Sequence, residues 1–150
     1  MSLFDVVAAI RFPLPDREEF AEVNSHLDDA DLDLVYSEAC QNALDERRSY
    51  LARLEQLDDA AHEQDEEFDA LLAELEACRA QIDEAEHRMR LLLAYGREFV
   101  RPQPYQLKDL ARAADISVSG VRIAYGEDEI TEAAQVTGAK PRRPALGAGR

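Results

Sequence analysis

The stretch from Tyr36 to Phe99 constrains the fold most, because it contains no proline and no glycine before Gly96. Apolar residues recur along it at alternating steps of three and four, the spacing typical of a coiled coil or of a long helix in a bundle. We call this row of residues the seam. It consists of Tyr36, Cys40, Ala43, Arg47, Tyr50, Leu54, Leu57, Ala61, Gln64, Phe68, Leu71, Leu75, Cys78, Ile82, Ala85, Met89, Leu92, Gly96 and Phe99. The pattern predicts a helix that, unbroken, would be roughly 95 Å long at 1.5 Å per residue.

One part of this predicted helix is weak. Seven acidic residues and no Lys or Arg lie between Glu55 and Glu67, and like charges four residues apart cost a few tenths of a kcal/mol each. A hairpin turning near residues 58–66 is therefore the alternative to one continuous helix. It would pack one apolar set against another, namely Leu44, Leu51, Leu54 and Leu57 against Phe68, Leu71, Leu72 and Leu75. Because no Gly, Pro or Asn marks a turn there, we favour the continuous helix.

The sequence before the seam predicts short helices. Ser2 and Asp5 can cap a first helix, although its β-branched residues also suit a strand. Two prolines then interrupt the chain, and Asp16 has the position of a second helix start. Asp31 or Asp33 is the expected cap of the long helix.

Charge is distributed unevenly along the chain, whose net charge is −15. Residues 1–100 carry 9 basic and 26 acidic side chains, whereas residues 101–150 carry 8 basic and 6 acidic ones. The acidic part should repel nucleic acid, so only the last third can lie against phosphate. The acidic region is either a solvated helix face or a surface that binds a basic protein partner.

Several classes of protein are disfavoured by the sequence. No apolar run approaches the length of a membrane span, and no basic segment followed by an apolar core opens the chain. We therefore expect a cytoplasmic protein without a membrane partner, with Cys40 and Cys78 reduced. His, Cys and carboxylate residues show no metal-ligand spacing, and no phosphate-binding glycine loop or nucleophile with a partner is evident. We expect no metal, no cofactor and no enzymatic activity. The use of 15 Arg against 2 Lys suggests a GC-rich bacterial source.

The segment 105–125, Tyr-Gln-Leu-Lys-Asp-Leu-Ala-Arg-Ala-Ala-Asp-Ile-Ser-Val-Ser-Gly-Val-Arg-Ile-Ala-Tyr, resembles a bacterial helix-turn-helix. Leu107, Leu110, Ala111 and Ala114 would form the inner face of its first helix, and Val121 and Ala124 would pack the second helix onto the first. Ile116 would fill the turn and Ser117 would cap the second helix. Asp115 stands where this family usually has Gly, and Asp tolerates the left-handed conformation better than most residues. Gly120 inside the second helix is unusual; it either allows close approach to a phosphate backbone or loosens the helix.

The resemblance implies a DNA-binding surface. The second helix would lie in the major groove with its outward residues facing base edges, and the first would contact phosphates. The implied DNA-binding residues are Ser117, Val118, Ser119 and Arg122 on the second helix and Lys108 and Arg112 on the first. The alternative is that this pair of helices only docks another protein.

Together these features predict an all-α chain with a long coiled-coil helix and a small C-terminal helix-turn-helix. We expect four parts: an N-terminal segment (1–33), an oligomerisation helix (34–100), the helix-turn-helix module (101–138) and a disordered basic tail (139–150). A helix over 127–137 would pack on the module, and the tail could follow a groove or phosphates. The predicted function is a transcriptional regulator that forms a homo-oligomer, most simply a homodimer, through residues 36–99. The alternative is an acidic coiled-coil adaptor that binds another protein, such as a component of the transcription machinery.

Overall fold

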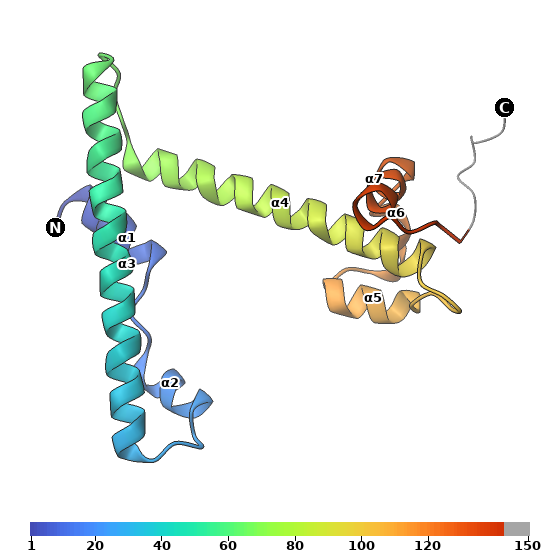
Figure 1. The fold of residues 1–150 in the computed structure, drawn as a ribbon, viewed down its shortest axis with the longest axis horizontal. Coiled ribbons are helices and arrows are strands. Elements are labelled where there is room, and N and C mark those ends of the chain that lie inside the picture. The colour runs from blue at the N-terminus through green and yellow to red at the C-terminus, as the bar shows by residue number, and fades with distance from the viewer. Residues whose placement is uncertain (143–150) are drawn as a thin grey trace. The chain divides into compact units, whose positions relative to one another are not determined.

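The protein is all-α over the residues described by its computed structural model, 1–142, which confirms the predicted fold class (Figure 1). Its helices are α1 (Leu3–Arg11), α2 (Arg17–Val23), α3 (Asp29–Glu63), α4 (Ala70–Glu98), α5 (Leu107–Ala114), α6 (Val118–Ile123) and α7 (Glu127–Thr137). The chain divides into two compact units, Met1–Cys78 and Arg79–Arg150. Most of the predicted basic tail, including Arg143 and Arg150, lies outside the described residues.

The predicted continuous helix is wrong, because α3 ends at Glu63 and α4 begins at Ala70. The break lies within the acidic stretch, where no cation offsets the repulsion between carboxylates. Asp65 has a left-handed backbone with φ 59°, so Asp does here what Gly or Asn commonly does in a turn. Asp69 then caps α4, since its Oδ1 accepts the backbone N–H of Leu71 at 2.9 Å.

The alternative hairpin is not formed either. The chain breaks close to the residues proposed for its turn, and Leu54 and Phe68 do share one core, but most of the leucines that should meet across the turn remain uncovered. The exposed ones include Leu44, Leu57, Leu71, Leu72 and Leu75. A break in the helix was therefore foreseeable from charge, whereas the direction of packing after it was not.

The N-terminal unit has its own small core, formed by α1, α3 and the start of α4. Val7, Leu54 and Ala70 are buried in it, and Phe4, Tyr50 and Phe68 pack around them. In addition, Phe12 contacts Tyr50 edge to face at 5.8 Å, and Phe20 contacts Tyr36 in the same way at 5.4 Å between ring centroids. Much of the N-terminal seam is therefore covered by the chain's own helices α1 and α2. The prediction that residues 36–99 form one intermolecular seam is wrong for this part.

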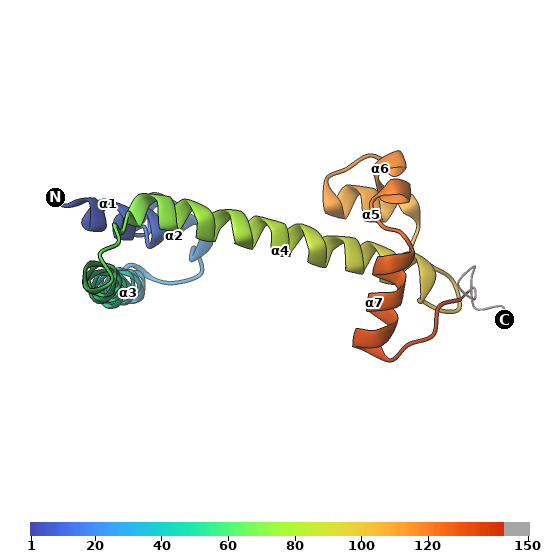
Figure 2. The same cartoon turned by 90° about the horizontal axis from the view of Figure 1, so that it is seen from above.

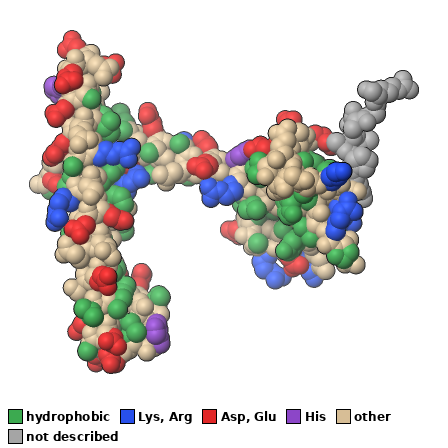
Figure 3. Space-filling model, in the orientation of Figure 1, with side chains coloured by type: hydrophobic (Ala, Val, Ile, Leu, Met, Phe, Trp, Pro, Cys, Tyr) green, Lys and Arg blue, Asp and Glu red, His purple; other side chains and the backbone are tan. Residues whose placement is uncertain are grey.

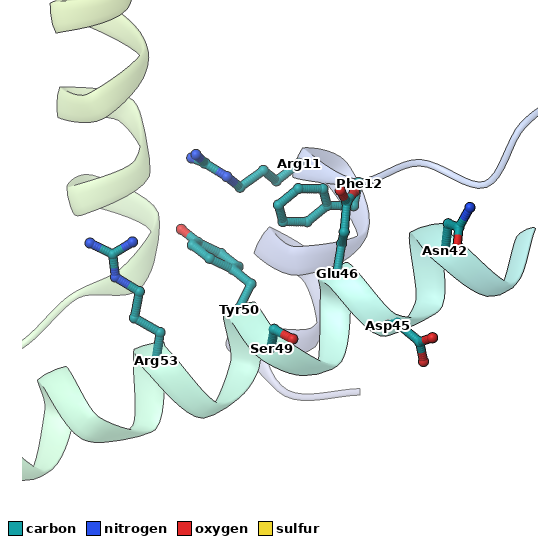
Figure 4. Close-up of a pocket in the computed structure, with 8 residues that line it drawn as sticks. All are labelled: Arg11, Phe12, Asn42, Asp45, Glu46, Ser49, Tyr50 and Arg53. Carbon is teal, nitrogen blue, oxygen red and sulfur yellow. The ribbon is translucent and has the colours of Figure 1, made fainter. Parts of the chain in front are cut away.

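Polar contacts hold α1 against this core. Arg47, which interrupts the seam, donates from Nε to the carbonyl of Phe12 at 2.7 Å, just beyond the end of α1. Arg11 and Phe12 extend towards Tyr50 of α3 around a shared hollow (Figure 4). Glu74 of α4 accepts from Arg11 Nη1 at 2.6 Å and from Tyr50 Oη at 2.5 Å. Burial, together with the hydrogen bond to Glu74, raises the pKa of Tyr50 above its ordinary value.

Helix starts follow the local signals with one exception. Ser2 and Asp5 form a complete capping box, and Asp16 accepts the backbone N–H groups that open α2. The cap of α3 is Asp28, which accepts the N–H of Asp31 at 2.9 Å, so the expected caps at Asp31 or Asp33 are wrong. Asp28, Asp31 and Asp33 lie close together in the sequence, and the helix begins after the first of them.

Candidate nucleic-acid interface

Helices α5 and α6 are joined by a tight turn at Asp115, as the sequence predicted. Asp115 has φ 53° and ψ 44°, the left-handed conformation, and its backbone lets Ile116 donate to the carbonyl of Ala111 at 3.0 Å. Ser117 caps α6, because its Oγ accepts the N–H of Gly120 at 2.8 Å. Local hydrogen bonds therefore set where the first helix ends and the second begins.

Gly120 has a structural explanation within the turn itself. A Cβ at this position would lie 3.2 Å from Ser117 Oγ and 3.4 Å from the Cβ of Ile116. The missing side chain leaves room for the capping hydroxyl and for the residue that fills the turn. The two readings offered by the sequence, a phosphate contact or a loosened helix, are not needed to explain this glycine.

The helix pair packs on the C-terminal half of α4, which forms the third helix of the module (Figures 1 and 2). Leu93 of α4, Ala111 of α5 and Val121 of α6 are buried together. Val121 has no exposed surface, as expected for the residue that holds the second helix to the first. Half-buried apolar residues complete this core, namely Met89, Leu107, Leu110, Ala114, Ile116, Ala124 and Tyr125.

The role of α4 in this module is not predicted from the sequence. The pattern of apolar residues places Met89 and Gly96 in the seam, but Met89 packs on the core of the module, and a Cβ on Gly96 would lie 3.3 Å from Leu110. The compact C-terminal unit begins at Arg79 rather than at 101. One feature of the sequence does indicate this packing. Gly96 occupies a seam position three residues after the extra Leu93, and a glycine there suits the close approach of another helix better than a coiled coil.

The link from α4 to α5 is held by two hydrogen bonds, one between backbone groups and one from a side chain. The N–H of Tyr105 donates to the carbonyl of Gly96 at 3.0 Å, and Arg97 Nη1 donates to the carbonyl of Tyr105 at 2.7 Å. These bonds turn the chain back so that α5 runs beside α4.

Helix α7, predicted at 127–137, closes the module with the same bounds. His87 Nε2 lies 2.9 Å from Glu132 Oε1, and Arg90 Nε lies 3.7 Å from Glu129 Oε1. Gly138 ends the helix with φ 67°. Both pairs are partly exposed, so they set the position of α7 more than they stabilise it.

The six predicted site residues lie on this module, and all are exposed. Lys108 and Arg112 are one turn apart on α5, and Figure 3 shows basic side chains along the edge of the C-terminal unit where α5 lies. Val118, Ser119 and Arg122 belong to α6, while Ser117 is engaged as its cap. None of the ion pairs found within residues 1–142 uses Lys108, Arg112 or Arg122, so their charges are available to a ligand. Ile123, which sequence analysis did not single out, is also exposed beside them.

Comparisons with protein-family models, with curated proteins and with solved structures return no match to this chain. Within residues 1–142, each helix is too short or too polar to cross a lipid bilayer.

Proposed function

We propose that this protein binds DNA through α5 and α6 and acts as a transcriptional regulator. The observation that carries the proposal is a pair of short helices joined by a left-handed turn at Asp115, with Ser119 and Arg122 exposed on the second helix. A short helix of this kind enters the major groove, where the guanidinium of Arg can bond the two acceptors of guanine. Lys108 and Arg112 on the first helix would contact phosphates.

The charge distribution supports the same surface. Residues 101–126 carry four basic and two acidic side chains, and residues 116–126 contain no acidic residue. The N-terminal unit, in contrast, carries 22 acidic and 5 basic side chains, so DNA would be repelled from it. A regulator of this kind would work in the bacterial cytoplasm.

The proposed active form is a homodimer. Helix α4 keeps an uncovered row of residues at seam spacing, of which Leu71, Leu75 and Ile82 are 43%, 57% and 47% exposed. Cys78 lies in the same row and is also exposed. A second copy presents an identical row at the same steps of three and four, which suits knobs-into-holes pairing. Two linked modules would bind two half-sites much more tightly than one.

Replacing Arg122 with alanine tests the reading helix. We expect Arg122→Ala to cost about 1–3 kcal/mol of binding free energy on the preferred site and to relax the preference at one base pair. The measurement is an affinity selection from random duplexes followed by titration of the selected site. Arg48→Ala, which removes an exposed arginine from the N-terminal unit, is the matched control and should leave binding unchanged. Unaltered binding by Arg122→Ala combined with Ser119→Ala would contradict the assignment of α6.

Substitutions on α5 should behave differently. Lys108→Ala and Arg112→Ala remove phosphate contacts, so each should weaken binding to all sequences about equally. Each should also reduce the slope of log K against log salt concentration by about one unit. Titrations of the selected site and of an unrelated duplex at several salt concentrations measure both effects. A sequence-specific loss would instead place α5 against the bases.

An acidic adaptor is the second candidate function, and the charge of the N-terminal unit favours it. A net charge of −17 over residues 1–78 is suited to a basic protein surface. Genome-wide crosslinking and sequencing of bound DNA separates the two functions. Sharp peaks over a shared motif that disappear with Arg122→Ala support direct reading of DNA, whereas peaks that survive this substitution support recruitment by another protein.

A further inference from the structure

A polar hollow of about 350 Å³ lies at the C-terminal end of α4, and none of the residues proposed to read DNA lines it. Its lining consists of Arg97, Glu98, Arg101, Pro102 and Arg142. The chain returns to α4 after α7, and the N–H of Arg142 donates to the carbonyl of Glu98 at 2.6 Å. Arg142 is thereby brought to the same space as Arg97 and Arg101, which lie about 40 residues earlier in the sequence.

The floor of the hollow is held by hydrogen bonds. The guanidinium of Arg97 is oriented by the carbonyl of Tyr105, 2.7 Å from Nη1, and Glu98 Oε1 accepts from Tyr125 Oη at 2.9 Å. Burial, followed by this bond to Glu98, raises the pKa of Tyr125 to about 12. The tyrosine therefore remains protonated at neutral pH and continues to donate to Glu98.

The charges around the hollow are not balanced. Three guanidinium groups and one carboxylate line it, which leaves a net charge of +2. Within residues 1–142, the ion pairs shorter than 4.0 Å do not join Glu98 to any of these arginines. Like charges in a partly enclosed site repel one another more strongly than in open water. An anion bound between the arginines would relieve this repulsion.

We propose that this hollow binds a phosphate group. Arginine presents a planar fork of donors that matches phosphate oxygens, and a phosphate monoester carries close to two negative charges at neutral pH. The end of a helix is normally unfavourable for an anion because its carbonyls carry partial negative charge. Here the carbonyls of Gly96 and Glu98 already accept backbone N–H groups, from Tyr105 and Arg142. The phosphate belongs either to a free phosphorylated small molecule or to a nucleic-acid backbone, and the site does not depend on base reading by α6.

Calorimetric titration of the full chain with inorganic phosphate, in chloride buffer at low salt, tests the site. We expect saturable binding that Arg101→Ala and Arg142→Ala each weaken about tenfold or more, since each removes charge-assisted hydrogen bonds. Both side chains are exposed, so the fold should survive, and circular dichroism of each variant checks this. Arg142→Lys keeps the charge but loses the fork, and we expect it to bind with intermediate affinity.

Arg79→Ala is the matched control, because it removes the same charge from an exposed position of α4 that pairs with Asp83. The proposal would be overturned if the full chain did not bind phosphate, or if Arg101→Ala and Arg79→Ala weakened phosphate binding equally. Titration of the same variants with random-sequence duplex DNA identifies the source of the phosphate. If Arg101→Ala lowers the affinity for DNA and inorganic phosphate competes with DNA for binding, the hollow binds the DNA backbone. If the affinity for DNA is unchanged, the hollow binds a free phosphorylated molecule.

Discussion

Replacing Val121 with aspartate should destabilise the C-terminal unit more than any other single change considered. Val121 has no exposed surface and packs in one core with Leu93 and Ala111, so the carboxylate would be removed from water without a partner. An uncompensated buried charge costs about 3–5 kcal/mol. The expected result is a separate early unfolding transition of α5, α6 and α7 in urea, followed by circular dichroism.

The neighbouring residue provides a matched control. Ile123 lies two positions further along α6 and is 84% exposed, so Ile123→Asp adds the same charge to the same helix without burying it. We expect its free energy of unfolding to stay within about 0.5 kcal/mol of the wild-type value, as is typical of surface substitutions, so its urea midpoint should hardly move. Equal midpoints for Val121→Asp and Ile123→Asp would mean that α6 does not pack on α4 and α5 as described.

Replacing Leu75 with aspartate should dissociate the proposed dimer. In one chain Leu75 is 57% exposed, and in the proposed pairing of α4 with its copy it becomes buried at the centre of the uncovered row. Each chain would then bury a carboxylate without a partner, which costs several kcal/mol and weakens association by about a hundredfold or more. Sedimentation equilibrium or light scattering at micromolar concentration measures the change.

Ala80→Asp is the control for this experiment. Ala80 is exposed on α4 and falls outside the row that contains Leu75, Cys78 and Ile82, so its substitution adds the same charge on the solvent side. We expect the control to remain a dimer. A wild-type chain that sediments as a monomer at these concentrations would remove the dimer from the proposed function, although it would leave the geometry of α5 and α6 unaffected.

Much of the local structure could be predicted from the sequence. The capping box at Ser2, the caps at Asp16 and Ser117 and the left-handed turn at Asp115 are all as expected. The six candidate DNA-binding residues could also be placed in advance, because they belong to one contiguous motif. The hollow lined by Arg97, Arg101 and Arg142 could not, because only the return of the chain to the end of α4 brings Arg142 to it.

Short-range interactions alone determined the starts of α1, α2 and α6 and the turn between α5 and α6, since caps and tight turns are made by hydrogen bonds between residues close together in the sequence. What covers each part of the seam was decided only by the tertiary structure. Leu54 is buried by Val7 and Ala70, and Met89 packs on the core that α4 forms with α5 and α6, whereas Leu75 is left exposed. The sequence could not distinguish these outcomes because burial of apolar surface has no direction: a row of leucines is stabilised equally by a helix of its own chain or by a second copy.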